Sequence, residues 1–552
     1  MSTATPTRPA ATAREQEPVG PEPFAGTGAL LRLFLRISRR QIVIWALAFL
    51  ALVASSVVAL EETYPDAAAL QARAALMDNP GAVLMTGPAF ALDDYTFGAM
   101  VANELSLWVL LPAAIMSVLL AVRHTRAEEE SGRLEMLRSL PVGRFAPAVA
   151  AMLTVAIADV AVGLALTGAL VGTGMEGADS VAFGVATTLT GLVFGAVAAV
   201  TAQLTEHART ASATAMGAVA VAFLVRGVGD VIDRQGSWLS WLSPFAWAQQ
   251  TRLYVDLRWW PLLVPVLTTA VLLAVAVVLA HRRDLGAGLL AARPGPAAAS
   301  RGLLSPVGLA RRLLTGTFVG WAVGLLLFAI AFGSLANALD GMVEDIPDIG
   351  EWIALDLDDL TRSFAAVMLS FLAIGPAALS VWGVLQLRGE ERAGRVEGVL
   401  VSGASRTRLL GGWLAVVAVG AVCTQVLLGL GVGLGVAAAT REAAWVPDLT
   451  AASLAYLPAV LVFAALAVAL YGVAPRLASV AWALVVWASV VVFLGDLLGL
   501  PAAARDVSPL AHTPLVPGVD VAAAPLVVMG GLAVLLIAVG LVGLGRRDVG
   551  RS

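Results

Sequence analysis

The residues whose type and spacing could do chemistry are charged, and they occur in two matching peptides. The first is RAEEESGRLEMLRSLPVGR, Arg126 to Arg144, and the second is RGEERAGRVEGVLVSGASR, Arg388 to Arg406. Seven of the nineteen positions are identical at a constant offset of 262 residues. Clustered carboxylates can exchange protons or bind cationic groups. Because the sequence has no GxSxG, HExxH or CxxC motif, ionic recognition is favoured over catalysis.

The identical positions are three glutamates, three arginines and one glycine. They are Arg126, Glu128, Glu129, Gly132, Arg133, Glu135 and Arg144 in the first copy, and Arg388, Glu390, Glu391, Gly394, Arg395, Glu397 and Arg406 in the second. Glu129 and Arg133 are four residues apart, in the order that favours pairing along a helix. One position departs from the pattern, since Glu130 becomes Arg392.

Apolar residues follow the glycine of each copy at three-residue spacing. They are Leu134, Leu137 and Leu140 in the first copy, and Val396 and Val399 in the second. This spacing predicts a short amphipathic helix whose apolar face lies toward a membrane. The helix should end near Pro141 in the first copy and near Gly403 in the second.

The glutamates have two interpretations. The charges of both copies could simply solvate a helix at a membrane surface. An anionic lipid surface, however, attracts arginine and gains nothing from Glu128, Glu129 and Glu135, and both copies keep these glutamates. A protein partner with basic residues would give them a use, and we expect them to be surface contacts with such a partner.

The elements that position these peptides are long apolar segments. Of the 552 residues, 59% are hydrophobic and only 13% are charged, whereas a soluble protein is roughly a quarter charged. Runs of about 20 apolar residues can cross a bilayer. Twelve such runs are predicted, at 41–60, 102–122, 145–172, 180–203, 211–229, 259–280, 315–337, 364–386, 409–437, 450–472, 477–499 and 522–544. The predicted fold class is an all-α polytopic membrane protein.

The charges between the spans predict the orientation of the chain. Arginines gather on one side of the predicted membrane, whereas the loops at 61–94 and 340–359 on the other side are mainly acidic. Since positive loops stay inside, the N- and C-termini are expected in the cytoplasm, with the chain passing many times through the cytoplasmic membrane.

The duplication extends beyond the charged peptides. SPFAW at Ser243 is echoed by SPLAH at Ser508, GD at Gly229 by GD at Gly495, and RRDLG at Arg282 by RRDVG at Arg546. Six spans were therefore copied as a unit, and an even number of spans gives two tandem parallel repeats. The expected boundaries are a disordered tail at 1–28, a first half at 29–284, a cytoplasmic linker at 285–310 and a second half at 311–552.

The EExxGRxE peptide directly after the second span of a six-span unit resembles the coupling helix of the permeases of type-2 ATP-binding-cassette (ABC) exporters, also called type V exporters. The fused twelve-span form is similar to the actinobacterial branch described as exporters of polyketide antibiotics, with its tetronasin-resistance and multidrug permeases. The resemblance implies that hydrophobic or amphipathic small molecules are moved out of the cell.

The resemblance also implies that two copies of a separate ATPase subunit dock on the two peptides. The residues implied to contact them are Glu128, Glu129, Gly132, Arg133, Glu135, Glu390, Glu391, Gly394, Arg395 and Glu397. ATP and Mg would be bound by that partner, and this chain itself is expected to hold no cofactor, metal or nucleic acid. In agreement, all 35 basic residues are arginine, so the chain has no lysine for a Walker A loop.

Asp159 lies inside the third span, where an ionisable group by default indicates function. It could serve a proton or substrate pathway, or it could form a structural hydrogen bond with a neighbouring span. Its repeat position is near Ala421, with Thr424 and Gln425 as the nearest polar residues. A pathway role would thus be confined to one half. A proton-coupled secondary transporter, which would use Asp159, is the alternative function, and a membrane enzyme acting on lipid-linked precursors is a more distant one. No substrate-contacting residue is predicted.

Two further features carry structural expectations. Ser243 and Ser508 precede the sixth and twelfth spans on the outer side, where they could begin short segments that cap the exit or simple proline-bounded turns. The single cysteine, Cys423, cannot form an intramolecular disulfide and is expected to be a small buried residue.

Overall fold

The computed structural model describes residues 22–77, 80–88, 90–283, 286–290, 297–298, 300–338, 360–494 and 500–548. The acidic residues at 340–359, Asp496 of the second GD pair, tail residues 1–21 and linker residues 291–296 lie outside these ranges. In the described ranges every regular element is a helix, as predicted.

Twelve helices in the described ranges are long and apolar enough to cross a membrane, which confirms the predicted fold class and number of spans. They are Thr27–Thr63 (α1), Phe97–Glu130 (α4 and α5), Ala146–Gly172 (α7), Gly177–Leu204 (α8), Ala208–Ile232 (α9), Trp260–His281 (η3 and α11), Pro306–Ala336 (α12 and the start of η5), Leu360–Arg392 (α15 and α16), Arg406–Thr440 (α18), Trp445–Val473 (α19, η7 and α20), Pro475–Phe493 (η8 and α21) and Ala523–Arg546 (α23).

The first helix begins earlier than predicted, at Thr27 instead of residue 41. Its first turns contain four arginines, which lower the hydropathy but are good helix formers. Order also reaches into the predicted tail, because the Phe145 N–H donates to the carbonyl oxygen of Pro23 at 3.0 Å. The predicted disordered tail is therefore wrong for residues 22–28.

The chain forms two compact units. The first contains Met1–Thr63, Val101–Gly229 and Gly236–Arg293, and the second contains Tyr64–Met100, Asp230–Gln235 and Pro294–Ser552. The segment between the first two spans, with helices α2 (Ala67–Met77) and α3 (Pro80–Thr86), thus belongs to the second unit although it comes from the first half of the sequence.

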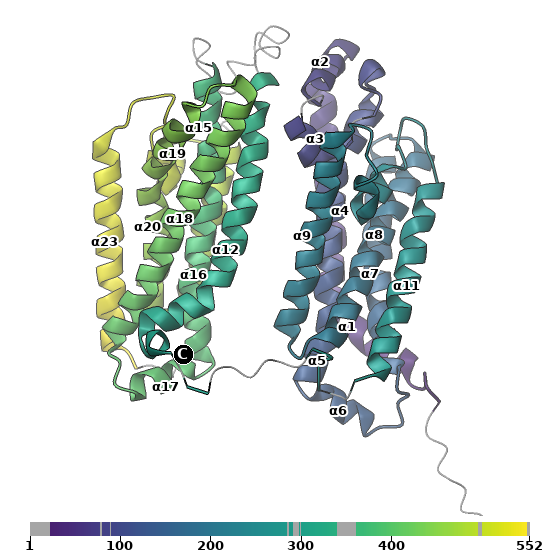
Figure 1. Cartoon of the computed structure of the whole chain (residues 1–552), viewed down its shortest axis with the longest axis horizontal. Coiled ribbons are helices and arrows are strands. Elements are labelled where there is room, and N and C mark those ends of the chain that lie inside the picture. Colours follow the sequence, from purple (N-terminus) through teal and green to yellow (C-terminus); the bar gives the residue numbers. More distant parts are fainter. Residues whose placement is uncertain are drawn as a thin grey trace, which may run out of the picture. The chain divides into compact units, whose positions relative to one another are not determined.

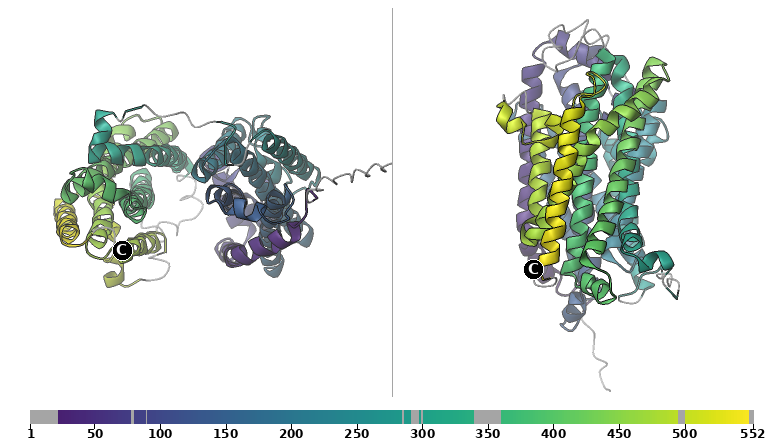
Figure 2. Two further views of the ribbon diagram at one scale, coloured as in Figure 1. Left: turned by 90° about the horizontal axis from the view of Figure 1, so that it is seen from below. Right: turned by 90° about the vertical axis from the view of Figure 1, so that its left-hand side faces the viewer.

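The same helix pairs recur in both units. In the first unit α1 packs on α7 and α8 packs on α11, whereas in the second unit α12 packs on α18 and α20 packs on α23 (Figure 1). These are spans one with three and four with six of each half. The left panel of Figure 2 looks along the helices of both units. The two six-span halves therefore share this order of packing.

Small residues let the spans approach closely, as is common between membrane helices. A Cβ atom on Gly163 of α7 or on Gly184 of α8 would lie 2.6 Å from the carbonyl oxygen of the other glycine. Cys423, in contrast, is exposed on α18, so the expectation of burial is wrong. A helix surrounded by lipid can present small apolar side chains outward without cost.

Candidate functional site

Each charged peptide forms a helical hairpin at the arginine-rich end of its unit. In the first unit α5 (Arg126–Glu130) is followed by α6 (Arg133–Arg138), and in the second α16 (Ile374–Arg392) is followed by α17 (Arg395–Val401). The glycine between the helices, Gly132 or Gly394, has φ of +73° in both copies. Glycine populates this left-handed region readily, so its repetition has a conformational reason. Both short helices end close to the predicted residues.

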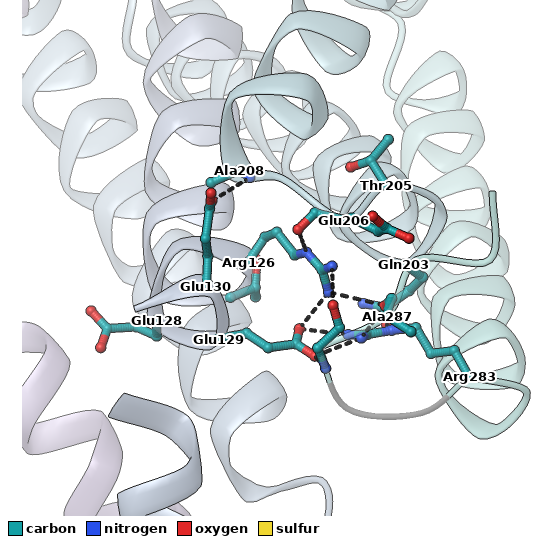
Figure 3. Close-up of polar contacts among 12 residues, drawn as sticks. Arg126, Glu128, Glu129, Glu130, Gln203, Thr205, Glu206, Ala208, Arg283 and Ala287 are labelled. Atoms are coloured by element: carbon teal, nitrogen blue, oxygen red, sulfur yellow. Dashed lines mark hydrogen bonds and ion pairs between the residues drawn. The ribbon is translucent and has the colours of Figure 1, made fainter. Parts of the chain in front are cut away.

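Glu129 points into the first unit and not toward its surface (Figure 3). Its Oε1 accepts hydrogen bonds from Arg283 at 2.6 Å and from the Gly286 N–H at 2.7 Å. Its Oε2 accepts from Arg283 at 2.8 Å and from Arg126 at 2.9 Å. The carboxylate therefore ties α5 to the chain that follows α11.

Glu391 makes the matching contact in the second unit. Its two oxygens accept hydrogen bonds from Arg547 at 2.6 and 2.7 Å, just beyond α23. The Arg547 guanidinium also lies 5.0 Å from the centre of the Tyr471 ring. Burial opposes the charged form of Arg547, but the hydrogen bonds and charge of Glu391 outweigh it and raise the pKa of Arg547.

The arginine that opens each peptide contacts the connection from span four to span five. Arg126 donates from Nε to the carbonyl oxygen of Glu206 at 2.9 Å, and Arg388 donates to that of Arg476 at 3.2 Å. Each unit therefore has a charged junction around a buried glutamate, and it joins the end of span two, the connection from span four to span five, and the end of span six. The first junction comprises Arg126, Glu129, Glu206, Arg283 and Gly286, and the second comprises Arg388, Glu391, Arg476 and Arg547.

The expectation that the glutamates are surface contacts is wrong for Glu129 and Glu391. Their side chains are 4% and 2% exposed, and arginines of the same chain occupy their oxygens. The predicted pairing of Glu129 with Arg133 is also wrong, since Gly132 ends the helix between them. Arg133 instead donates to Glu128 at 2.6 and 3.0 Å.

The second copy repeats the Glu128 contact, because Arg395 donates to Glu390 at 2.5 and 2.7 Å. These hydrogen bonds raise the pKa of Arg133 and of Arg395. Arg133, Glu135, Arg395 and Glu397 remain exposed on the hairpins. The repeated charges that are open to a partner therefore include these four, and their contact with an ATPase stays a prediction.

Asp159 is buried where three helices of the first unit meet. The Ser117 hydroxyl of α4 donates to its Oδ1 at 2.6 Å, and a Cβ on Gly191 of α8 would overlap its carboxyl group. In the second unit, Gln425 of α18 donates to the carbonyl oxygen of Ser453 at 2.8 Å. Asp159 thus forms a hydrogen bond with a neighbouring span, as one of its two interpretations requires, and a pathway role stays a prediction.

Known proteins resemble this chain over nearly its whole length. The family model described as the C-terminal domain of the multidrug efflux system permease Rv1217c matches residues 29–282 and 303–544. The multidrug efflux system permease protein Rv1217c of Mycobacterium tuberculosis (strain ATCC 25618 / H37Rv) is 36% identical over 531 residues, which are 95% of this chain and 96% of that protein. The chain belongs to this family of multidrug efflux permeases. The resemblance to exporter permeases, stated from the charged peptides, is confirmed.

The two hairpins of the permease differ at one position, where Glu130 of the first half corresponds to Arg392 of the second. The contacts of Glu130 within the chain explain this difference. The carboxylate of Glu130 accepts a hydrogen bond from the N–H of Ala208, the first residue of α9, at 2.8 Å. The peptide ARTAS at 208–212 corresponds to PRLAS at 475–479, so Pro475 replaces Ala208. Proline has no N–H to donate. The second half of the permease therefore lacks both this donor and, with Arg392 in place of Glu130, the acceptor.

The Ser-Pro elements of the permease begin short helices. Ser243 caps α10 (Pro244–Gln249) by accepting a hydrogen bond from the Phe245 N–H at 3.3 Å, and Ser508 precedes the 3-10 helix η9 (Pro509–His512). Both serines are buried. Among the described residues, no group of three or more His, Cys, Asp or Glu side chains is placed to hold a metal ion.

The arginines that complete the junctions lie outside the two charged peptides. Arg283 and Arg547 belong to the repeated RRD peptides, so the signal was present in the sequence. Repetition shows that a residue occupies the same place in both halves, but it does not show which residue it contacts.

Proposed function

We propose that this permease is the membrane subunit of an ABC exporter, on which two copies of a separate ATPase subunit dock, one under each half. The arginine-rich ends of both units, with the chain termini, lie in the cytoplasm. The cargo is a hydrophobic or amphipathic small molecule that leaves the cell. The observation that carries the proposal is that each hairpin is fixed to its unit on one side and exposes charged residues on the other.

The two junctions support a coupling role because they leave the hairpins little freedom to move alone. Glu129 accepts four hydrogen bonds, from two arginine side chains and one backbone N–H. Displacing the hairpin therefore displaces the end of span two together with the chain beyond span six. Hydrogen-bond and ion-pair networks of this kind can carry coupling between distant sites.

ATP hydrolysis is assigned to the partner on chemical grounds. A Walker A loop uses a lysine to reach the outer phosphates of the nucleotide. All 35 basic residues of the permease are arginine, so this chain cannot supply that group. ATP and Mg would be held by the ATPase subunits.

A proton-coupled transporter is the second candidate, and Asp159 is the observation that favours it. Its Oδ2 is buried and has no hydrogen-bond partner among the described residues. Against this function, the second unit places the amide Gln425 on the corresponding helix, and an amide cannot carry a proton through a titration cycle.

The test is affinity purification of the permease in mild detergent, followed by mass spectrometry and an ATPase assay. We expect two ATPase subunits for each permease chain. Reversing the exposed hairpin charges with Arg133→Glu, Glu135→Arg, Arg395→Glu and Glu397→Arg should remove the ATPase and leave the permease folded. Arg311→Glu, an exposed substitution outside the hairpins, is the matched control.

Two results would contradict the proposal. The permease could purify without an ATPase while still exporting, or the fourfold variant could retain its ATPase and its transport. Loss of transport in the fourfold variant with a folded chain and a released ATPase would support the docking surface directly.

A further inference from the structure

The first unit contains a cavity of about 400 Å³ at its arginine-rich end. Two aromatic rings, Phe34 and Phe145, form part of its wall. Its polar lining includes His124, Glu129, Arg144 and Arg283. The cavity therefore combines an apolar wall with charged groups, as a site for an amphipathic ligand would.

His124 presents a buried polar atom that has no partner in the part of the chain that the structure describes. The residue is 2% exposed, its Nε2 lies 2.7 Å from the Ser38 hydroxyl, and its ring stacks on Phe34 with centres 4.6 Å apart. Its Nδ1 has no hydrogen-bond partner among the described residues. When the Ser38 hydroxyl donates to Nε2, or when the ring is protonated, Nδ1 carries a hydrogen and can donate to a ligand.

Among the described residues, the side chain around the cavity that is left without a counter-charge is the cationic Arg144. Both oxygens of Glu128 accept from Arg133, and those of Glu129 accept from Arg126 and Arg283. Arg144, in contrast, is exposed and forms no hydrogen bond or ion pair within the described part of the chain. Its guanidinium lies 5.8 Å from the centre of the Phe145 ring.

The second unit shows that Arg144 departs from its repeat. The matching residue, Arg406, donates hydrogen bonds to backbone oxygens at the end of α23, namely those of Leu544, Gly545 and Arg547. The positions that correspond to Leu544 and Arg547 are Ala280 and Arg283, and both line the cavity beside Arg144. The arginine that is used internally in one half is therefore available to a ligand in the other.

We propose that this cavity binds the phosphate head group of an anionic phospholipid from the adjacent leaflet. Arg144 and His124 Nδ1 donate to the phosphate, while Phe34 and Phe145 contact the glycerol and the upper acyl chain. Basic pockets between membrane helices on the cytoplasmic side suit such head groups. Leu33 is exposed beside Phe34 on α1, where the acyl chain would continue. The inference rests on the proposed cytoplasmic placement of this end and not on the ATPase.

Native mass spectrometry of the full chain in detergent, titrated with phosphatidylglycerol, tests the site. The wild type should retain one phosphatidylglycerol and should not retain phosphatidylcholine. Arg144→Gln should weaken binding about tenfold or more, as loss of a charged hydrogen bond does. Arg144→Lys should keep most of the affinity because the charge remains.

The matched control is Arg39→Gln, which removes an exposed arginine from the same end of the unit without changing the cavity lining. It should bind phosphatidylglycerol like the wild type. Equal binding by Arg144→Gln, or equal retention of phosphatidylcholine, would overturn the proposal. Binding of glycerol 3-phosphate as tightly as the lipid would also overturn it, since the ligand would then be a soluble phosphate. No ATPase is present, so the outcome is independent of the docking proposal.

Discussion

Removing the carboxylate of the second junction should destabilise the permease strongly. Glu391 and Arg547 share two hydrogen bonds, and their side chains are 2% and 14% exposed. Glu391→Gln leaves the Arg547 charge without its counter-charge where little water reaches it. Removing one partner of a buried ion pair costs about 3–5 kcal/mol. We expect the lower end of this range, because the Tyr471 ring still contacts the guanidinium.

A double-mutant cycle separates the pair from its surroundings. Arg547→Met alone should also destabilise the permease, because the buried Glu391 carboxylate then loses two charged hydrogen bonds. The double variant contains neither charge, so its loss should be smaller than the sum of the two single losses. Residues in direct contact typically show interaction free energies of about 0.5–3 kcal/mol, and we expect a value of about 2 kcal/mol here.

The free energy of unfolding can be measured by titrating the permease in mixed micelles with a denaturing detergent. Glu390→Gln is the matched control, since Glu390 shares two hydrogen bonds of 2.5 and 2.7 Å with Arg395 and lies one residue away. Arg395 is 62% exposed, so solvent screens that pair and its loss should change little. If Glu391→Gln unfolds at the same denaturant concentration as Glu390→Gln, the assignment of a buried junction is wrong.

Three further substitutions test local features of the first unit. Glu130→Ala should destabilise the start of α9 by about 1 kcal/mol, which is the usual effect of losing a helix cap. Hydrogen exchange of the backbone amides at the start of α9 should then become faster, and unchanged exchange would contradict this prediction. Gly132→Ala should cost about 1–2 kcal/mol through backbone strain, whereas the helical Gly398→Ala should not destabilise, as unfolding midpoints will show. Asp159→Asn keeps the acceptor for Ser117 and should therefore retain folding and transport; a folded variant without transport would instead support a proton pathway.

The spans were predictable because their signal is local. A helix of about 20 consecutive apolar residues is long enough to span the hydrocarbon core of a bilayer. Each of the twelve predicted runs corresponds to such a helix. The short helices after Gly132 and Gly394 were predictable for the same reason. The spacing of their apolar residues and the residues that end them lie within a short stretch of sequence. The start of α1 was missed because hydropathy records where a helix enters lipid and not where the helix begins.

The junctions could not be predicted in this way because their partners are distant in the chain. Glu129 and Arg283 are 154 residues apart, and Glu391 and Arg547 are 156 apart. An exposed glutamate and a buried, neutralised one look identical in the sequence. Gly132 was the local feature that excluded the pairing of Glu129 with Arg133, since its positive φ separates α5 from α6.

The first half has Ala208 where the second half has Pro475, and this difference constrains how the two halves can evolve. Arg392→Glu would restore the carboxylate of the first half, but Pro475 offers it no N–H, so the substitution gains nothing until a second one occurs. Each change is neutral or harmful without the other, which is epistasis between positions in different helices. Once the duplicated halves had diverged at this pair, single substitutions could no longer return them to identity, and chimeras that exchange only one hairpin will inherit the mismatch.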